Sequence, residues 1–270
     1  MNILMPMAGA GKRFADAGYP QLKPLILTTE RRDGKRYPMV VCAMHDVPES
    51  TGTADKRIFI IRTDYVCDIR PELLKYYPDA EIIGVGYLTE GQACTCLLAK
   101  DMINNNDPLF IAGCDNGMVW DKERFDAACS DSDVLVFTYR HDDSVLVNPN
   151  AYGWVRTEED SDTVTGVSVK KPISDNPLND HAVVASFWFR RGCDFVRCAE
   201  EMIEANDRVN NEFYVDKVID YCVKAGLNTK VFEIDRYIGW GTPADYERYE
   251  NTIAYWNGFT HSKAFLPKYL

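Results

Sequence analysis

The chain has 270 residues, of which 46% are hydrophobic and 26% are charged, and its formal net charge is −11. This is an ordinary globular composition, long enough for one large α/β domain or two small ones. The negative charge argues against a general nucleic-acid binder, and no apolar run approaches the roughly 20 residues that span a bilayer. The first residues do not have the pattern of a secretory signal, so we expect a cytoplasmic protein whose nine cysteines are free thiols.

Taken in chain order, the first half of the sequence alternates between two kinds of segment. Short apolar runs predict strands at 2–7, 57–62, 80–86, 108–114 and 133–140. Segments with helical spacing follow or precede them at 37–47, 64–77, 90–103 and 121–129. This alternation predicts βαβ units and therefore a doubly wound, mostly parallel, Rossmann-like sheet with helices on both faces.

The second half of the sequence predicts a small mixed β region. Two strands around an acidic turn are expected over 152–171, and further strands at 182–190 and 229–234. Helices are expected at 193–206, 212–226 and 242–256, the last with Thr242 as N-cap and Pro243 in its first turn. With no repeat or linker, we predict one domain, with a nucleotide-binding half at about 1–145 and an acceptor-binding half at about 146–270.

Positive charge collects near the N-terminus. Residues 1–36 contain seven Lys or Arg against three Asp or Glu, a net of +4 in an acidic chain. Local positive charge on an acidic protein suggests a site for a small anion. Part of this charge surrounds Asp33-Gly34, which predicts a β-hairpin, and we expect those cations to be its solvated face.

The glycine-containing stretch after the first strand has the features of a phosphate-binding loop. Glycines let the backbone approach a phosphate, and successive N–H groups form a nest for an anion. The spacing is not that of a Walker P-loop, and Phe14 stands where a dinucleotide-binding fingerprint has its third glycine. The third known pattern is G-x-G-x-R-[FL] followed by K-P, and it is present here as Gly9 to Phe14 and Lys23-Pro24.

Several blocks of the sequence together resemble the sugar-phosphate nucleotidylyltransferases. These blocks are "PMAGAGKRF", "LKPLI", "TEGQACTCLLA", "PLFIAGCDNGMVWD", "VSVKKP", "NNEFYVDKVID" and "GWGTPADYE". The likeness is nearest to the capsule and surface-polysaccharide branch, which includes enzymes with non-sugar acceptors. It implies Mg²⁺-dependent transfer of a nucleoside monophosphate from an NTP to a phosphorylated small molecule, with release of pyrophosphate. Both reactants are anions, so catalysis would be mostly positioning and charge neutralisation.

The resemblance also implies roles for individual residues. Arg13 and Lys23 would bind the triphosphate, and Asp115 would hold Mg²⁺. The remaining positions are nucleotide-binding Met7, Ala8, Gly9, Ala10, Gly11, Lys12, Gly91 and Gln92, and acceptor-binding Tyr152, Gly153, Lys171, Ser186 and Glu212.

Two positions depart from the family pattern. Gly239 stands where the family has a second metal-binding aspartate, so Mg²⁺ would rely on Asp115 and water, or on a different carboxylate such as Asp235 or Glu212. Lys170 replaces the glutamate of the family's E-K-P motif. Strand alternation predicts that Lys171 faces the acceptor and that Lys170 points away.

We therefore expect a nucleotidylyltransferase in surface-glycan precursor synthesis, with a sugar 1-phosphate as acceptor. The alternatives are a cytidylyltransferase for a non-sugar phosphate such as phosphocholine, and a non-catalytic nucleotide-binding subunit, which Gly239 motivates. A Rossmann oxidoreductase fits less well because of Phe14. We expect no nucleic-acid or membrane partner. The aromatic tail from Tyr255 to Leu270 packs either on its own domain or on a second copy in a homo-oligomer.

Overall fold

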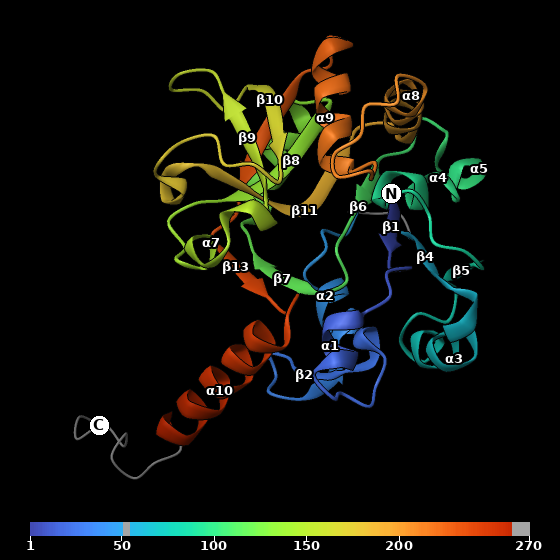
Figure 1. The fold of residues 1–270 in the computed structure, drawn as a ribbon, viewed down its shortest axis with the longest axis vertical. Coiled ribbons are helices and arrows are strands. Elements are labelled where there is room, and N and C mark those ends of the chain that lie inside the picture. Colours follow the sequence, from blue (N-terminus) through green and yellow to red (C-terminus); the bar gives the residue numbers. More distant parts are fainter. Residues whose placement is uncertain (51–54, 261–270) are drawn as a thin grey trace.

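A nine-stranded mixed sheet forms the centre of the computed structural model, which describes residues 1–50 and 55–260 (Figure 1). Its main path runs β10-β9-β11-β6-β1-β4-β5, with β8 and β12 attached through β11. The strands are β1 (Asn2–Pro6), β4 (Lys56–Arg62), β5 (Glu81–Val85), β6 (Leu109–Ile111), β8 (Val134–Tyr139), β9 (Gly153–Thr157), β10 (Val164–Val169), β11 (His181–Phe189) and β12 (Thr229–Glu233).

The sheet is parallel where the sequence alternates and mixed where it does not. Strands β1, β4, β5 and β6 pair in parallel, whereas β11 is antiparallel to β6, β8 and β9. Residues 58–61 of β4 are wholly buried, as expected of a parallel strand that is covered on both faces. The predicted α/β fold class, with its mixed C-terminal region, is confirmed.

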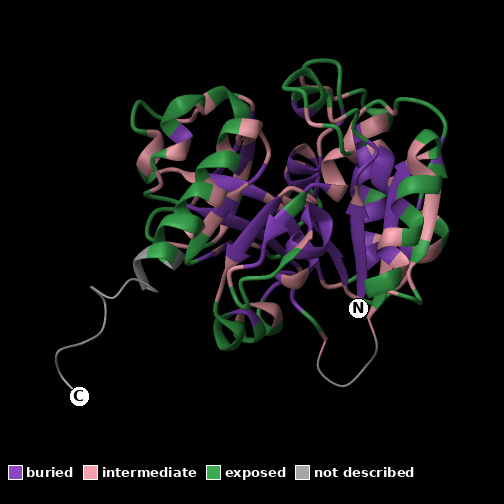
Figure 2. Ribbon diagram, turned by 90° about the horizontal axis from the view of Figure 1, so that it is seen from below, coloured by how far each residue is buried: buried purple, intermediate pink, exposed green. Residues whose placement is uncertain are grey.

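Helices cover both faces of this sheet. Alternate residues of β4 belong to two separate apolar cores, Phe59 to one and Ile58 to the other. The first core is completed by α2 (Met39–His45), α3 (Val66–Tyr76) and α6 (Lys122–Ser130). The second is completed by α4 (Gln92–Leu97), α5 (Lys100–Ile103), α8 (Gly192–Glu204) and α9 (Val215–Lys224). Figure 2 shows the buried strands between these partly exposed helices.

The single helix predicted over 90–103 is divided into α4 and α5. The N–H groups of Leu98 and Ala99 donate to carbonyls three residues back, on Thr95 and Cys96. These tighter bonds interrupt the α-helical pattern between the two segments.

Two small ribbons lie outside the main sheet. The predicted hairpin around Asp33-Gly34 is confirmed as β2 (Leu27–Thr29) paired with β3 (Arg36–Pro38). The second ribbon, β7 (Asn116–Val119) with β13 (Arg236–Gly239), was not predicted. Its two strands are far apart in the sequence, so no local sequence pattern predicts that they pair.

The last helix, α10 (Pro243–Thr260), extends away from the body of the molecule in Figure 1. As expected, Thr242 caps its start, since the hydroxyl accepts the N–H of Asp245 at 3.2 Å and donates to the Asp245 carboxylate at 2.7 Å. Residues 261–270 of the aromatic tail lie outside the described residues. In the described part of the chain, no helix is long and apolar enough to cross a membrane.

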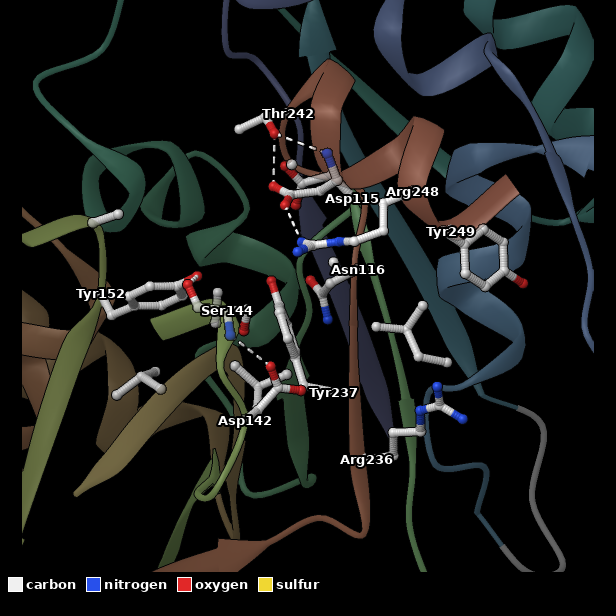
Figure 3. A pocket seen from close by; sticks show the side chains of 18 of the residues that line it. Asp115, Asn116, Asp142, Ser144, Tyr152, Arg236, Tyr237, Thr242, Arg248 and Tyr249 are labelled. Carbon is white, nitrogen blue, oxygen red and sulfur yellow. Dashed lines mark hydrogen bonds and ion pairs between the residues drawn. The ribbon is translucent and has the colours of Figure 1, made fainter. Parts of the chain in front are cut away.

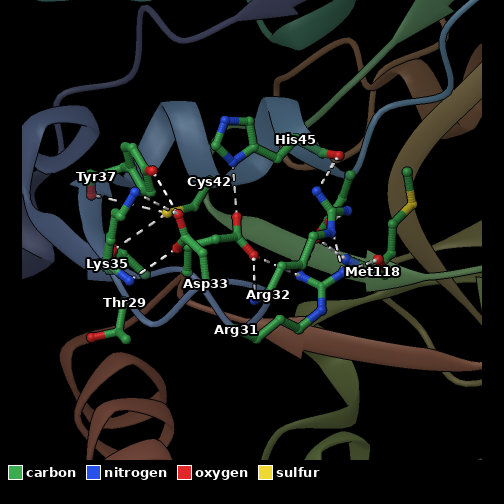
Figure 4. Close-up of polar contacts among 12 residues, drawn as sticks. Thr29, Arg31, Arg32, Asp33, Lys35, Tyr37, Cys42, His45 and Met118 are labelled. Carbon is green, nitrogen blue, oxygen red and sulfur yellow. Dashed lines mark hydrogen bonds and ion pairs between the residues drawn. The ribbon is translucent and has the colours of Figure 1, made fainter.

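The cations of the hairpin form the solvated face that we expected only in part, since Arg32, Lys35 and Arg36 are exposed but Arg31 is not. Arg31 binds both carboxylate oxygens of Asp46, at 2.8 and 2.7 Å, and Arg32 binds Asp46 and the His45 carbonyl (Figure 4). Arg31 also donates to the Met118 carbonyl at 3.0 Å, while the Met118 N–H donates to Asp46 at 2.9 Å. The Asp46 side chain is 1% exposed. The hairpin, α2 and β7 are therefore joined at one buried carboxylate.

We predict that Asp46→Ala lowers the free energy of unfolding by about 3 kcal/mol or more, because it leaves Arg31 and the Met118 N–H without their acceptor. Asp64→Ala is the control, since Asp64 pairs with Arg62 at the surface and is 67% exposed. That change should cost less than about 1 kcal/mol. Urea unfolding of both variants measures the difference, and equal losses would contradict the role given to Asp46.

Candidate functional site

A cavity of about 660 Å³ opens beyond the carboxyl ends of several strands of the sheet. Arg13 follows β1, Asp115 follows β6, Asp142 follows β8 and Lys170 follows β10. Ligands of open α/β sheets bind at this edge. Figure 3 shows Asp115, Asp142, Tyr152 and Tyr237 around the cavity, with Arg248 and Tyr249 contributed by α10. The lining comes from both predicted halves of the chain.

The glycine-containing loop positions Arg13 at the cavity. Gly11 has a φ of 59°, the left-handed conformation that glycine adopts easily, and it precedes the short helix α1 (Lys12–Asp16). Phe14 is 1% exposed and packs edge-on against Tyr19, with ring centroids 5.1 Å apart. A buried anchor at this position explains why the loop has phenylalanine where a dinucleotide fold has glycine. Within the described residues, the Arg13 side chain has no hydrogen-bond or ion-pair partner.

Lys23 and Asp115 form the central ion pair of the site. Lys23 Nζ lies 2.5 Å from Asp115 Oδ2 and 3.2 Å from the carbonyl oxygen of Gly241. Burial has the largest single effect and lowers the pKa of Lys23, but the charge and hydrogen bond of Asp115, together with Cys114, outweigh it, so the net pKa lies above its ordinary value. The amine therefore stays charged and neutralises Asp115.

The remaining nucleotide-binding candidates divide into two groups. Gln92 lines the cavity with Arg13. The others do not line it: Met7 and Ala8 are buried, Gly9, Ala10 and Lys12 are exposed, and Gly11 and Gly91 are partly buried. Gly91 has a structural requirement of its own, because a Cβ there would lie 2.5 Å from backbone atoms of Phe213. The nucleotide-binding roles of this set stay predictions.

The acceptor-side candidates are only partly brought together. Tyr152 and Gly153 line the cavity as expected. Lys171, Ser186 and Glu212 do not: Lys171 and Glu212 are exposed, and Ser186 is 1% exposed inside the sheet. Their places on the cavity wall are taken by neighbours, namely Lys170, Ala185, Tyr214 and Asp216.

The backbone explains the exchange of Lys171 for Lys170. Lys170 follows the end of β10 with a φ of 58°, so the alternation of an ideal strand stops before it. Its backbone N–H donates a hydrogen bond to the Tyr152 carbonyl at 2.9 Å, and its side-chain ammonium donates one to the Ala151 carbonyl. The expectation that Lys170 points away is therefore wrong. Ala185 also has a positive φ, 60°, where the pairing of β11 shifts, which turns it rather than Ser186 to the cavity.

The carboxylates suit a Mg²⁺ ion that is held mainly by substrate. Among the described residues, no three acidic, His or Cys side chains are grouped to hold a metal. Asp235 pairs with Arg124 and Glu212 is exposed, and neither lines the cavity, so neither is placed beside Asp115. Asp115 does line the cavity and fits Mg²⁺, which commonly takes one or two carboxylates plus phosphate oxygens. The second ligand stays a prediction.

Tyr237 occupies the space beside Gly239. A Cβ on Gly239 would lie 3.1 Å from the Tyr237 ring, which itself stacks on Tyr139 with centroids 4.4 Å apart. Burial raises the pKa of Tyr237, and Asp115, Asp245 and Asp142 raise it further. An aromatic side chain in a negative environment thus stands where the family pattern has a carboxylate.

Asp142, Asp143, Asp216 and Tyr237 also line the cavity and were not predicted. Asp142 follows the end of β8 much as Asp115 follows the end of β6. The expectation that polar residues just after a strand end line the ligand site would therefore have found Asp142 as well. No sequence signal was available for Tyr237, because its place depends on the pairing of β13 with β7.

No protein-family model matches the sequence, and no curated protein matches it either. Solved structures do match the fold. A nucleoside-diphosphate-sugar pyrophosphorylase of Vibrio cholerae RC9 superposes with a TM-score of 0.70 at 21% identity, covering 92% of this chain and 99% of that one. The chain has the nucleotidyltransferase fold.

Two further structures agree. A Bacillus anthracis protein assigned as a glucose-1-phosphate thymidylyltransferase, solved with sucrose, gives a TM-score of 0.70 at 16% identity over 94% of this chain and 95% of that one. The inositol-1-phosphate CTP transferase of T. maritima gives 0.64 at 16% identity, over 93% and 95%. At these identities the likeness establishes the shared fold, and activity has to be argued from the site.

Proposed function

We propose that this protein is a nucleotidylyltransferase, which transfers a nucleoside monophosphate from an NTP to a phosphorylated small acceptor and releases pyrophosphate. The observation that carries the proposal is the meeting of Arg13, Lys170 and the Lys23–Asp115 pair at one cavity beyond the strand ends. Cations placed beside a carboxylate that can hold a divalent ion suit a reaction between two phosphates.

The residues of the chain would act by charge and position. Arg13 offers a planar fork for the phosphates of the leaving pyrophosphate, and it has no competing partner in the described part of the protein. Lys23 places a point charge beside Asp115, near the position of the α-phosphate. A Mg²⁺ ion bound through Asp115 would neutralise charge on the transferring group.

On the acceptor side, Lys170 is the residue that faces the cavity. Burial lowers its pKa, and the neighbouring Asp216 carboxylate partly offsets this change. A lysine that is poorly solvated gains more from an incoming phosphate than an exposed one, because less water is displaced. This argument favours Lys170 over Lys171 for the acceptor phosphate.

A sugar 1-phosphate is the first choice of acceptor, within a cytoplasmic route to surface-glycan precursors. Two structural neighbours are named for sugar or sugar-phosphate substrates and one for inositol 1-phosphate. A second candidate is a non-sugar phosphate with a cationic group, such as phosphocholine. Asp142 and Asp143 beside the rings of Tyr152 and Tyr237 favour it, because carboxylates and aromatic faces attract cations.

The decisive experiment measures pyrophosphate release for each NTP against glucose 1-phosphate, inositol 1-phosphate and phosphocholine in the presence of Mg²⁺. We expect one pairing to give turnover, and Arg13→Ala to reduce it by about 10²-fold or more. Nucleotide binding without pyrophosphate release in any pairing would favour the non-catalytic subunit instead.

We predict that Lys170→Ala raises the acceptor KM by about tenfold or more and leaves the NTP KM nearly constant. The matched control is Lys171→Ala, one residue along the chain, which should change neither constant because its side chain is exposed and outside the cavity. Steady-state kinetics with either substrate varied provide the test. A larger rise of the acceptor KM in Lys171→Ala than in Lys170→Ala would contradict this assignment and favour Lys171, the lysine expected from the sequence.

We also predict that Asp115→Asn abolishes Mg²⁺-dependent turnover, because the amide has the shape of the carboxylate but cannot offer a negative ligand. EDTA should abolish turnover by the wild-type enzyme, and added Mg²⁺ should restore that turnover. Asp235→Asn is the control and should keep nearly full activity, since Asp235 is engaged with Arg124 away from the cavity. Undiminished turnover in EDTA would contradict the metal assignment.

A further inference from the structure

Asp216 is a buried carboxylate for which the described residues supply no side-chain partner. It is 9% exposed and lines the cavity from the first turn of α9. Among the residues that the structure describes, no other residue donates a hydrogen bond to its carboxylate and no ion pair joins it to Lys170. Burial raises the pKa of Asp216, and the charge of Lys170 only partly offsets this. A carboxylate in this position reduces the stability of the free protein.

The fold makes specific room for this side chain. A Cβ on Gly153 would lie 2.1 Å from Asp216 Oδ2, so the carboxylate occupies space that exists only because residue 153 is glycine. Gly153 starts β9 next to Tyr152, and both line the cavity. The ammonium of Lys170 lies 5.6 Å from the centroid of the Tyr214 ring on the same side.

A purely structural role for Asp216 is the alternative, because acidic residues in the first turn of a helix favour its dipole. Asp194 is an example of a buried aspartate with such a structural role in the same protein. It lies in the first turn of α8, is 4% exposed, and is held by Arg191 at 2.8 and 3.0 Å and by Arg197 at 3.4 Å. Asp216 also lies in the first turn of its helix, but no arginine of the described chain binds its carboxylate.

We propose that Asp216 is a specificity-determining residue of the acceptor site, whose carboxylate accepts hydrogen bonds from a hydroxyl or ammonium group of the acceptor while Lys170 binds its phosphate. This inference rests on the proposed function. The missing hydrogen bonds of Asp216 are supplied by substrate. Asp216 and Lys170 line the same cavity and interact electrostatically, so the acceptor carries a donor group as well as its phosphate. Acceptors without such a donor leave Asp216 without a hydrogen bond and are rejected, and phosphocholine is among them because its quaternary ammonium has no N–H.

The first measurement is the melting temperature of the free protein. Asp216→Asn keeps the shape and removes a buried unpaired charge, so the Tm should rise by about 2 to 4 °C. The matched control, Asp194→Asn, removes a buried charge that is paired, so its Tm should fall. A lower Tm in Asp216→Asn would indicate the structural role and overturn the proposal.

The second measurement is binding by calorimetry, with three probes. Glucose 1-phosphate carries hydroxyl donors, phosphoethanolamine carries an ammonium donor, and methyl phosphate carries neither. Asp216→Asn should weaken binding of at least one of the first two by about tenfold or more, and the probe affected identifies the donor. It should bind methyl phosphate as well as, or better than, the wild-type protein, because a negative charge is removed.

Unchanged affinity for the donor-bearing probes in Asp216→Asn would overturn the proposal, as would failure of the wild-type protein to bind either of them. These outcomes are distinct from failure of the proposed function. Absence of pyrophosphate release with every NTP would reject catalysis while leaving the binding and melting results for Asp216 intact.

Discussion

The ion pair between Lys23 and Asp115 is the interaction on which the site depends. It joins the segment after the glycine loop to the end of β6, and the lysine also reaches the Gly241 carbonyl just before α10. Three segments far apart in the chain thus meet at one amine. Since the ammonium and the carboxylate pair with each other, neither charge is left without a partner in the free protein.

A further carboxylate, Asp46, supports this arrangement and, unlike the partly exposed Asp115, it is buried. Asp46 holds Arg31 and the N–H of Met118, and so fixes the start of the β7–β13 ribbon that follows Asp115. The packing in this region is tight, because a Cβ on Gly117 would lie 2.7 Å from an Asp46 oxygen. Arg31 and Arg32 therefore help to fix the geometry beside the site, whereas Lys35 and Arg36 stay exposed.

The acceptor side follows a different physical principle. Asp46 is paired with two arginines and stabilises the fold, whereas Asp216 is also buried but has no side-chain partner within residues 1–50 and 55–260. A protein keeps such a group only if something else repays its desolvation, and a substrate is the simplest candidate. The positive φ angles of Lys170 and Ala185 lie on the same wall, consistent with local backbone strain held at a binding site.

The sequence by itself determined the fold class and most elements, because the periods of 2 and 3.6 in apolar spacing are local properties. It also placed Arg13 and Asp115 at the cavity, since residues just beyond strand ends gather at one edge of a parallel sheet, and the resemblance to the nucleotidylyltransferases placed Tyr152 there. Only the tertiary structure decided which lysine faces the cavity, that Tyr237 stands beside Gly239, and that Asp216 has no side-chain partner among the described residues. Those features depend on a left-handed residue after β10 and on a ribbon whose strands are distant in the chain, and neither leaves a periodic trace in the sequence.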